Sequence, residues 1–240
     1  MMSAPSDRCW GVIPAAGTGT RMNSAVPKQY LEVAGATVLE HSLRALLNCE
    51  FIEAVVVALD PEDKRATALS CLTDSRVVLV NGGEQRSDSV LAGLQGLNGL
   101  ASQGDWVLVH DAARPCVSCE DVAALAQRVI STGLGGILAE PLVDTIKRSD
   151  INGLIIETLE RDKLWRAQTP QMFRVELLRN ALQSAQLKGI AITDEASAME
   201  LAGEAVQIIS SSRSNLKITV PQDLQLAAFY LAQQHADSRP

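Results

Sequence analysis

Residues 12–28 read VIPAAGTGTRMNSAVPK: a short apolar run leads into a glycine-rich turn, and the cations Arg21 and Lys28 follow. Gly17 and Gly19 allow positive φ and a close approach of the backbone to a ligand. Successive N–H groups in such a turn form a concavity that suits phosphate oxygens. The segment has no acidic residue, although the net charge of the chain is −7. We therefore predict that this turn holds a polyphosphate.

The spacing of the glycines excludes two common motifs. A dinucleotide-binding fingerprint needs glycine at its first, third and sixth positions, and the sixth position counted from Gly17 is Met22. A P-loop needs G-x-x-x-x-G-K-[ST], and the chain contains no Gly-Lys-Ser or Gly-Lys-Thr. An ordinary strand-to-helix turn would need the glycines but neither cation. The turn therefore predicts a phosphate site of another kind.

Composition limits the class of protein. Hydrophobic residues make up 47% of the 240 residues, and we predict one domain, residues 1–240, with a buried core. The net charge of −7 and an aromatic content of 3% argue against a nucleic-acid partner. Apolar runs such as residues 54–59 are too short for a membrane span, and the first residues lack the apolar region of a signal peptide. We expect a cytoplasmic protein, or in a eukaryote a processed organellar one, with no membrane partner.

The five cysteines show no disulfide spacing. Cys116-x-x-Cys119 is a lone pair, and a redox or zinc site would need a second pair or a thioredoxin-like setting. Reduced thiols are therefore expected.

Apolar strands alternate with helical patterns along most of the chain. Fully apolar strands separated by helices predict an α/β, Rossmann-like, mostly parallel sheet with helices on both faces. A capping-box sequence, TVLE, opens the first of these helices. The predicted strands are residues 9–14, 54–59, 76–80, 106–110, 136–139, 206–209 and 216–219, and the predicted helices are residues 37–47, 90–97, 118–130, 175–188, 193–202 and 221–231.

The alternation breaks at residues 142–160, which we predict to be an inserted β-arm. Asn152-Gly153 lies between two extended runs and is a strong hairpin signal. Because a two-stranded hairpin is marginally stable alone, we expect the arm to project and to pack on a second subunit in a homodimer. A surface insertion without a partner is the alternative.

Polar residues that follow the predicted strands indicate the site, because ligands of open α/β sheets bind beyond the carboxyl ends of the strands. No nucleophile is paired with a base, and for His110 we expect packing or a backbone hydrogen bond. Cations and glycines without a nucleophile are typical of phosphoryl or nucleotidyl transfer. No metal site built by the protein is expected, and Mg²⁺ would be held mainly by nucleotide phosphates. The residues collected in this way are Arg21, Lys28, Gly83, Glu84, Arg86, Ser89, Asp111, Arg114, Asp144, Thr145, Arg161 and Lys217.

An ordered set of motifs covers residues 12–231, nearly the whole chain. They are PAAGTGTRM, PKQY, GGEQRSDSVLAGL, VLVHDAARP, TPQMF, ITDEAS and NLKIT. The chain resembles the 2-C-methyl-D-erythritol 4-phosphate cytidylyltransferases of the non-mevalonate isoprenoid pathway. The glycine loop alone is shared by many nucleotidyltransferases, whereas the full set is much more specific.

The resemblance implies a reaction and assigns residues to it. The acceptor's phosphate oxygen would attack the α-phosphorus of CTP in line, giving 4-diphosphocytidyl-2-C-methyl-D-erythritol and pyrophosphate. The residues implied to stabilise the charge at phosphorus are Arg21, Lys28 and Lys217. Those implied to contact the nucleotide are Ala15, Ala16, Gly17, Gly19, Gly83, Glu84, Arg86, Ser89 and Asp111. Those implied to contact the acceptor are Asp111, Arg114, Thr169 and Thr193, together with Thr145 and Arg161 from the arm of a partner subunit.

Three alternatives are open. A ribitol 5-phosphate cytidylyltransferase has similar motifs, although the arm segments VDTIKR and ERDKLW look more like the isoprenoid enzyme. A non-catalytic nucleotide sensor would need the glycine turn but not Arg21, Lys28 and Lys217. A nicotinamide dehydrogenase fails on the missing third glycine.

Overall fold

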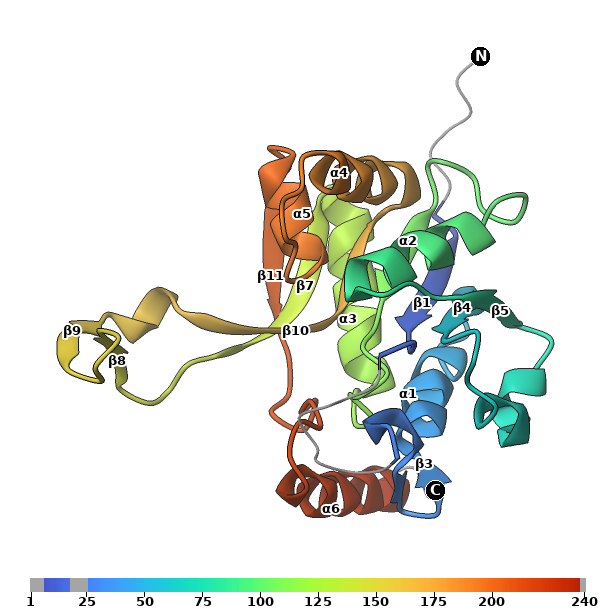
Figure 1. Cartoon of the computed structure of the whole chain (residues 1–240), viewed down its shortest axis with the longest axis horizontal. Coiled ribbons are helices and arrows are strands. Elements are labelled where there is room, and N and C mark those ends of the chain that lie inside the picture. Colours follow the sequence, from blue (N-terminus) through green and yellow to red (C-terminus); the bar gives the residue numbers. More distant parts are fainter. Residues whose placement is uncertain (1–6, 18–25, 238–240) are drawn as a thin grey trace.

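The computed structural model describes residues 7–17 and 26–237, and a seven-stranded sheet forms its centre (Figure 1). The strand order is β11-β7-β10-β6-β1-β4-β5. β10 runs antiparallel to both of its neighbours, and the other pairings in this sheet are parallel. The predicted α/β class with a mostly parallel sheet is confirmed. The strands are β1 (Cys9–Pro14), β4 (Ile52–Leu59), β5 (Val77–Asn81), β6 (Trp106–Val109), β7 (Gly135–Pro141), β10 (Trp165–Arg174) and β11 (Val206–Ser210).

Helices cover both faces of the sheet, because alternate side chains of a strand point to opposite sides. Cys9 and Ile13 of β1 pack with helices α1 and α3, whereas Trp10 and Val12 pack on the other face with α2, α4 and α5. None of the helices in the described residues is long and apolar enough to cross a membrane. The bounds are α1 (Val38–Leu47), α2 (Arg86–Gly96), α3 (Cys119–Thr132), α4 (Val175–Leu187) and α5 (Glu195–Leu201).

The last helix, α6 (Gln222–Asp237), packs apart from the two faces of the sheet (Figure 1). Its Ala227 belongs to a small third core with Val33 of β2 (Glu32–Val33), the strand that pairs with β3 (Ala36–Thr37). The third core therefore holds the chain that follows the glycine turn.

The start of α1 confirms the capping box. The Glu40 backbone N–H donates to Thr37 Oγ1 at 3.2 Å, and the Thr37 N–H donates to Glu40 Oε2 at 2.8 Å. Two of the orphan donors of the first turn are satisfied in this way.

The predicted strand at residues 216–219 is wrong, because this segment pairs with no strand in the described chain. Its Ile218 N–H donates to Ala113 O at 2.8 Å, and the Ile218 side chain is fully buried in the third core. The apolar pattern thus reflects a packed loop, which places Lys217 beside the residues that follow β6.

A further strand, β10, was not predicted from the sequence. Pro170 lies inside it, and a proline normally argues against a central strand because it cannot donate to the ladder. The structure accommodates the proline at an irregularity: the register of β10 against β7 shifts between Ala167 and Gln171.

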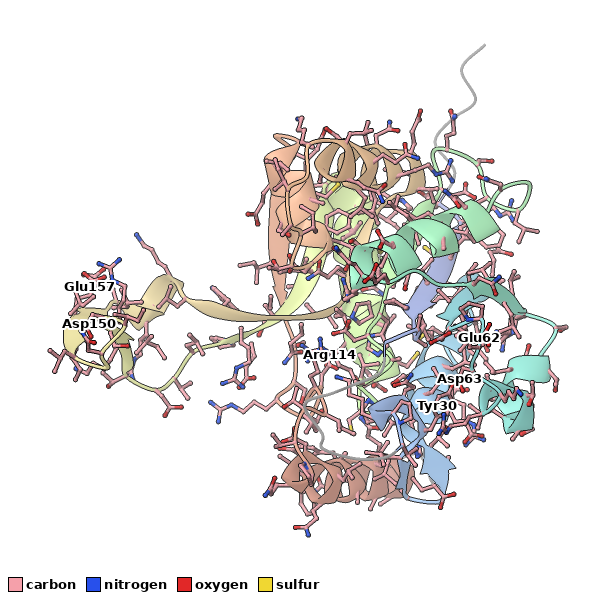
Figure 2. The ribbon with its side chains drawn as sticks, viewed as in Figure 1. Tyr30, Glu62, Asp63, Arg114, Asp150 and Glu157 are labelled. Atoms are coloured by element: carbon pink, nitrogen blue, oxygen red, sulfur yellow. The ribbon has the colours of Figure 1, made fainter. Side chains whose placement is uncertain are left out.

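The predicted arm is present as a hairpin of β8 (Ile146–Ser149) and β9 (Ile155–Leu159). Gly153 adopts φ of +82° in the loop between the two strands, whereas Asn152 has no positive φ, so the loop is not a two-residue type I′ turn. The arm projects away from the sheet (Figure 1), and its Asp150 and Glu157 lie far from Arg114 in the body of the molecule (Figure 2).

The two cysteines of Cys116-x-x-Cys119 contact different elements. Cys116 Sγ lies 3.6 Å from the carbonyl oxygen of Ala227 in α6, whereas Cys119 Sγ lies 2.9 Å from Cys49 Sγ after α1. Burial raises the pKa of Cys116 to about 12, so its thiol stays protonated. All five cysteines are free thiols.

A close approach of α2 to β1 generates a stability prediction. A Cβ on Gly93 would lie 2.5 Å from Cγ1 of Val12, a fully buried residue of β1. Gly93→Leu should lower the free energy of unfolding by about 2 kcal/mol or more, measured by urea denaturation. Gln95→Leu, at an exposed position of the same helix, is the matched control and should cost far less. Equal losses in the two variants would contradict tight packing at Gly93.

Candidate active site

Two cavities lie side by side at the carboxyl ends of β1 and β6. The first has a volume of about 270 Å³ and the second about 210 Å³. Both are lined by Arg86, Asp111 and Lys217, which form a shared wall. The first cavity is also lined by Pro14, Ala15, Ala16, Gly17, Lys28, Gln29, Gly83, Glu84, Gln85, Ser89, Ala112, Ala113 and Thr219. The second is also lined by Arg114, Ala167, Gln168, Thr169, Gln171, Thr193 and Asp194.

The floor of the first cavity is the backbone that leaves β1. The Ala15 N–H donates to Ala58 O at 2.8 Å, which continues the pairing of β1 with β4. Gln29 Nε2 donates to the carbonyl oxygens of Ala15 at 3.0 Å and Gly17 at 2.9 Å. Because the Gln29 side chain is buried, it fixes the first residues of the glycine turn.

A second glycine segment closes the first cavity from the side of β5. A Cβ on Gly82 would lie 2.5 Å from the Cβ of Ala16, so only glycine allows this approach. The Gly83 N–H donates to Ser89 Oγ at 3.1 Å, which ties the segment to the first turns of α2. The structure thus brings the two predicted glycine segments together around one space.

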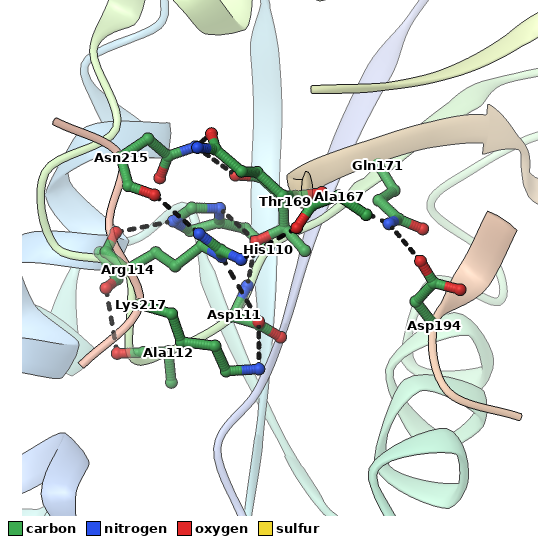
Figure 3. A network of polar contacts seen from close by, with 12 residues as sticks. His110, Asp111, Ala112, Arg114, Ala167, Thr169, Gln171, Asp194, Asn215 and Lys217 are labelled. Atoms are coloured by element: carbon green, nitrogen blue, oxygen red, sulfur yellow. Dashed lines mark hydrogen bonds and ion pairs between the residues drawn. The ribbon is translucent and has the colours of Figure 1, made fainter. Parts of the chain in front are cut away.

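Asp111 is the centre of the shared wall (Figure 3). Its Oδ1 accepts from Arg86 Nε at 2.9 Å, and its Oδ2 accepts from Lys217 Nζ at 2.7 Å. Arg114 Nε lies 3.6 Å from Oδ2. Burial alone would raise the pKa of Asp111, but the charges of Arg86 and Lys217 outweigh it and hold the pKa well below its usual range. Asp111 is therefore ionised at neutral pH.

A second buried carboxylate, Glu195, holds the other end of Arg86. Arg86 Nη1 and Nη2 donate to Glu195 Oε1 and Oε2 at 2.7 and 3.0 Å, a bidentate pair. Burial alone would lower the pKa of Arg86, but Glu195 and then Asp111 raise it above its ordinary value. Arg86 thus links α2, the loop after β6 and the start of α5.

Arg114 and Asn215 order the wall of the second cavity. Arg114 Nη1 donates to Asn215 O at 2.7 Å, and Asn215 Nδ2 donates to Thr169 O at 2.8 Å. Thr169 and Thr193 line this cavity with Asp111 and Arg114, so four of the six predicted acceptor residues lie together.

Thr145 and Arg161 do not join the other predicted residues. Both belong to the arm region, and neither lines the two cavities of this chain. The Arg161 guanidinium donates to the carbonyl oxygen of Val143, at the base of the arm. Asp144, from the same region, lines neither cavity.

Two predicted residues of the glycine turn, Gly19 and Arg21, lie outside the described residues. Lys28 lines the first cavity, and its Nζ donates to Ile218 O at 3.3 Å. Lys28 therefore contacts the segment that carries Lys217, and both lysines line this cavity although they are far apart in the sequence.

Sequence reasoning missed Gln29 and Glu195. Both lie in motifs already quoted, PKQY and ITDEAS, but their partners lie elsewhere in the chain. The available signal was a polar side chain beside a predicted site residue, and it does not distinguish a buried anchor from an exposed neighbour.

Comparison with known proteins identifies the family of this chain. Residues 10–233 match the model of the family described as IspD, 2-C-methyl-D-erythritol 4-phosphate cytidylyltransferase. The chain belongs to this family. A Vibrio vulnificus protein with the same description is 48% identical over 223 residues, which cover 93% of this chain and 94% of that protein. A Photorhabdus laumondii protein with that description is 47% identical over 229 residues, which cover 93% and 94% of the two chains.

Solved structures of the IspD family share the fold. The crystal structure of a 4-diphosphocytidyl-2C-methyl-D-erythritol synthase superposes with a TM-score of 0.81 at 39% identity, over 94% of this chain and 99% of that one. The Francisella tularensis IspD structure gives a TM-score of 0.80 at 34% identity, over 94% of this chain and 100% of that one.

His110 supports the wall from behind the cavities of this IspD family member. The carbonyl oxygen of Arg114 only accepts, so His110 Nε2 donates to it, at 3.0 Å. His110 Nδ1 then accepts from the Thr169 hydroxyl at 3.1 Å, and Thr169 Oγ1 accepts from the Asp111 N–H at 2.9 Å. These contacts suit the neutral imidazole, which burial favours. His110 is fully buried, as the expectation of packing and a backbone hydrogen bond predicts.

The neutral imidazole predicts a pH dependence of stability. Burial lowers the pKa of His110 from 6.5 to about 4. Between these two pH values, His110 therefore binds a proton in the unfolded chain but not in the folded chain. The contribution of neutral His110 to the free energy of unfolding is therefore fully present above pH 6.5, and it is lost as the pH falls to about 4. The loss due to His110 should be on the order of 3 kcal/mol.

His110→Gln removes this titration and keeps a polar side chain. The difference in free energy of unfolding between wild type and His110→Gln should therefore shrink as the pH falls from 7 to 4.5, measured by urea denaturation at each pH. A constant difference would show that His110 is not held neutral.

Proposed function

We propose that this chain transfers the cytidylyl group of CTP to the phosphate of 2-C-methyl-D-erythritol 4-phosphate. The products are 4-diphosphocytidyl-2-C-methyl-D-erythritol and pyrophosphate. The observation that carries this proposal is the pair of cavities with a common wall of Arg86, Asp111 and Lys217 in a member of the IspD family. Two anions that react with each other need adjacent sites with cations between them.

In the proposed reaction the first cavity takes CTP. Backbone groups of Ala15, Ala16 and Gly83 lie where they can test the edges of a base, and Ser89 and Glu84 lie beside them. Lys28 and Lys217, together with Arg21, neutralise the charge that grows on the α-phosphoryl group during displacement of pyrophosphate. Preorganised cations of this kind need no reorganisation as charge develops.

The second cavity takes the acceptor. Arg114, Thr169 and Thr193 offer a guanidinium and two hydroxyls, which suit a phosphorylated polyol. Because Arg86 and Lys217 line both cavities, an acceptor phosphate here lies next to the nucleotide phosphates. This adjacency supports in-line attack of an acceptor oxygen on the α-phosphorus.

The arm supplies the remaining acceptor contacts from a partner subunit in a homodimer. Thr145 and Arg161 lie on an arm that leaves the body of its own chain (Figure 1). Apolar side chains on the arm are open to solvent in the single chain: Ile151 is 100% exposed, Leu154 68% and Ile155 65%. Such exposure on a two-stranded hairpin supports a covered interface.

Mg²⁺ is the proposed cofactor, held mainly by the phosphates of CTP. Within residues 7–17 and 26–237, no three side chains of the metal-binding types come together. Both carboxylate oxygens of Asp111 already accept from cations. The residues present therefore suit an ion that arrives with the nucleotide. When bound, the ion would neutralise phosphate charge and align the phosphates. A cytoplasmic location and the absence of a nucleic-acid partner stay predictions from the sequence.

The acceptor is tested by assaying pyrophosphate release from CTP with 2-C-methyl-D-erythritol 4-phosphate and, separately, with ribitol 5-phosphate. We expect a kcat/KM for the methylerythritol phosphate at least about tenfold higher, because the site must fit a branching methyl group. Faster turnover of ribitol 5-phosphate would make the chain a ribitol phosphate enzyme. CTP binding without turnover of either acceptor would favour the non-catalytic sensor.

The composite site predicts complementation between inactive chains. In a heterodimer of Lys28→Ala and Arg161→Ala subunits, one of the two sites combines the intact cavities of one subunit with the intact arm of the other. Random mixing should therefore restore about a quarter of wild-type activity, whereas each variant alone stays nearly inactive. A mixture of Lys28→Ala and Lys217→Ala chains is the control, because both variants damage the core and no intact site forms. Equal activity in the two mixtures would argue for sites confined to one chain.

A further inference from the structure

The strongest unexplained contact in the site is the buried pair of Arg86 and Glu195. Glu195 is 1% exposed and lines neither cavity, so within the described chain it meets no ligand space directly. Its two carboxylate oxygens both accept from the Arg86 guanidinium, at 2.7 and 3.0 Å. A bidentate pair fixes the plane of a guanidinium as well as its position.

The start of α5 holds Glu195 in place. Gln171 of β10 accepts from the Ala196 N–H at 2.8 Å through Oε1, and its Nε2 donates to Asp194 Oδ2 at 2.9 Å. The Asp194 side chain in turn accepts from the Ser197 N–H at 3.0 Å. Glu195 is therefore anchored on both sides by groups that a central strand positions.

Arg86 has donors left after these contacts. A guanidinium carries five N–H groups. Three of them are used, two by Glu195 and one by Asp111 Oδ1 at 2.9 Å. Because Arg86 lines both cavities, the two remaining N–H groups are available to ligands at the shared wall.

The negative charge of Glu195 is unexpected beside a site for anions. A buried carboxylate close to a site for two phosphate esters repels both ligands. A chain selected only for anion affinity would carry a neutral residue there. The benefit that offsets this repulsion must come from geometry, that is, from holding the Arg86 fork.

We propose that Glu195 is a positioning residue for the cytidylyl transfer: it orients the Arg86 guanidinium so that its free N–H groups and its bond to Asp111 face the reacting phosphates. This inference rests on the proposed function of the site. It assigns the ITDEAS motif a role at the shared wall, through a residue that touches no substrate.

Two substitutions separate geometry from charge. Glu195→Gln keeps the shape and removes the charge, and Glu195→Asp keeps the charge and shortens the reach. The role proposed here predicts that both variants bind CTP about tenfold more weakly, since both break the bidentate pair between residue 195 and the Arg86 guanidinium. A purely electrostatic role predicts tighter binding by Glu195→Gln and no change in Glu195→Asp. Glu200→Gln, an exposed carboxylate on the same helix, is the matched control and should behave as wild type.

The measurements are the dissociation constant for CTP with Mg²⁺ by isothermal titration calorimetry, and kcat and KM for both substrates. Thermal unfolding and circular dichroism show whether each variant is folded. Weaker CTP binding in folded Glu195→Gln and Glu195→Asp, with a lower kcat/KM for both substrates, is the expected result. Tighter CTP binding in Glu195→Gln overturns the proposal, as does a lower melting temperature with unchanged CTP affinity and kcat/KM.

Failure of the function and failure of this inference give different results. If the wild-type chain does not turn over CTP with either acceptor, the proposed function fails. If the wild type is active and both variants retain wild-type CTP affinity, only the role of Glu195 fails. Should Glu195→Gln not fold, Glu195→Asp still decides, because a charge-only role leaves its CTP affinity unchanged and a positioning role weakens it.

Discussion

The buried charge of Asp111 is the constraint on which the site depends. A carboxylate that is 6% exposed is costly unless cations pair with it. Arg86 and Lys217 donate to it directly, and Arg114 lies close. Asp111 also stabilises the cations, because three cations gathered beside a phosphate site repel one another. Asp111 makes their assembly possible before any anion arrives, and so it sets the positions of the groups that both cavities share.

Most of the fold could be predicted because local and global signals agree. Strands such as β4 and β6 are buried nearly throughout, and a continuous apolar run identifies a strand of this kind without knowledge of its neighbours. β10 could not be found in this way. Its central position is set by pairing with β6 and β7, and Pro170 fits only because the register shifts there. Conversely, Ile218 belongs to an apolar run that packs in a core without joining any ladder of the described chain.

The site was predictable to the extent that one topological rule applies. Residues after the carboxyl ends of parallel strands meet at one edge of the sheet, and this rule brought Ala15, Gly83 and Asp111 together from distant segments. Lys217 reaches the same cavity from a packed loop, which the rule does not cover. The rule does not identify residues that act through another side chain. Arg86 and Glu195 are 109 positions apart, and His110 and Thr169 are 59 apart. No local pattern encodes which buried carboxylate faces which guanidinium, so this layer of the site becomes visible only in three dimensions.

The shared wall also explains how one lysine can serve structure and chemistry together. Lys217 Nζ lies 2.7 Å from Asp111 Oδ2, and an ammonium carries three N–H donors. It can keep its bond to Asp111 while two further donors face the cavities that it lines. In the proposed transfer, charge shifts from one phosphate to its neighbour across this wall. A cation held by a fixed carboxylate between the two cavities can follow that shift without leaving its place, which is the property that a preorganised site requires.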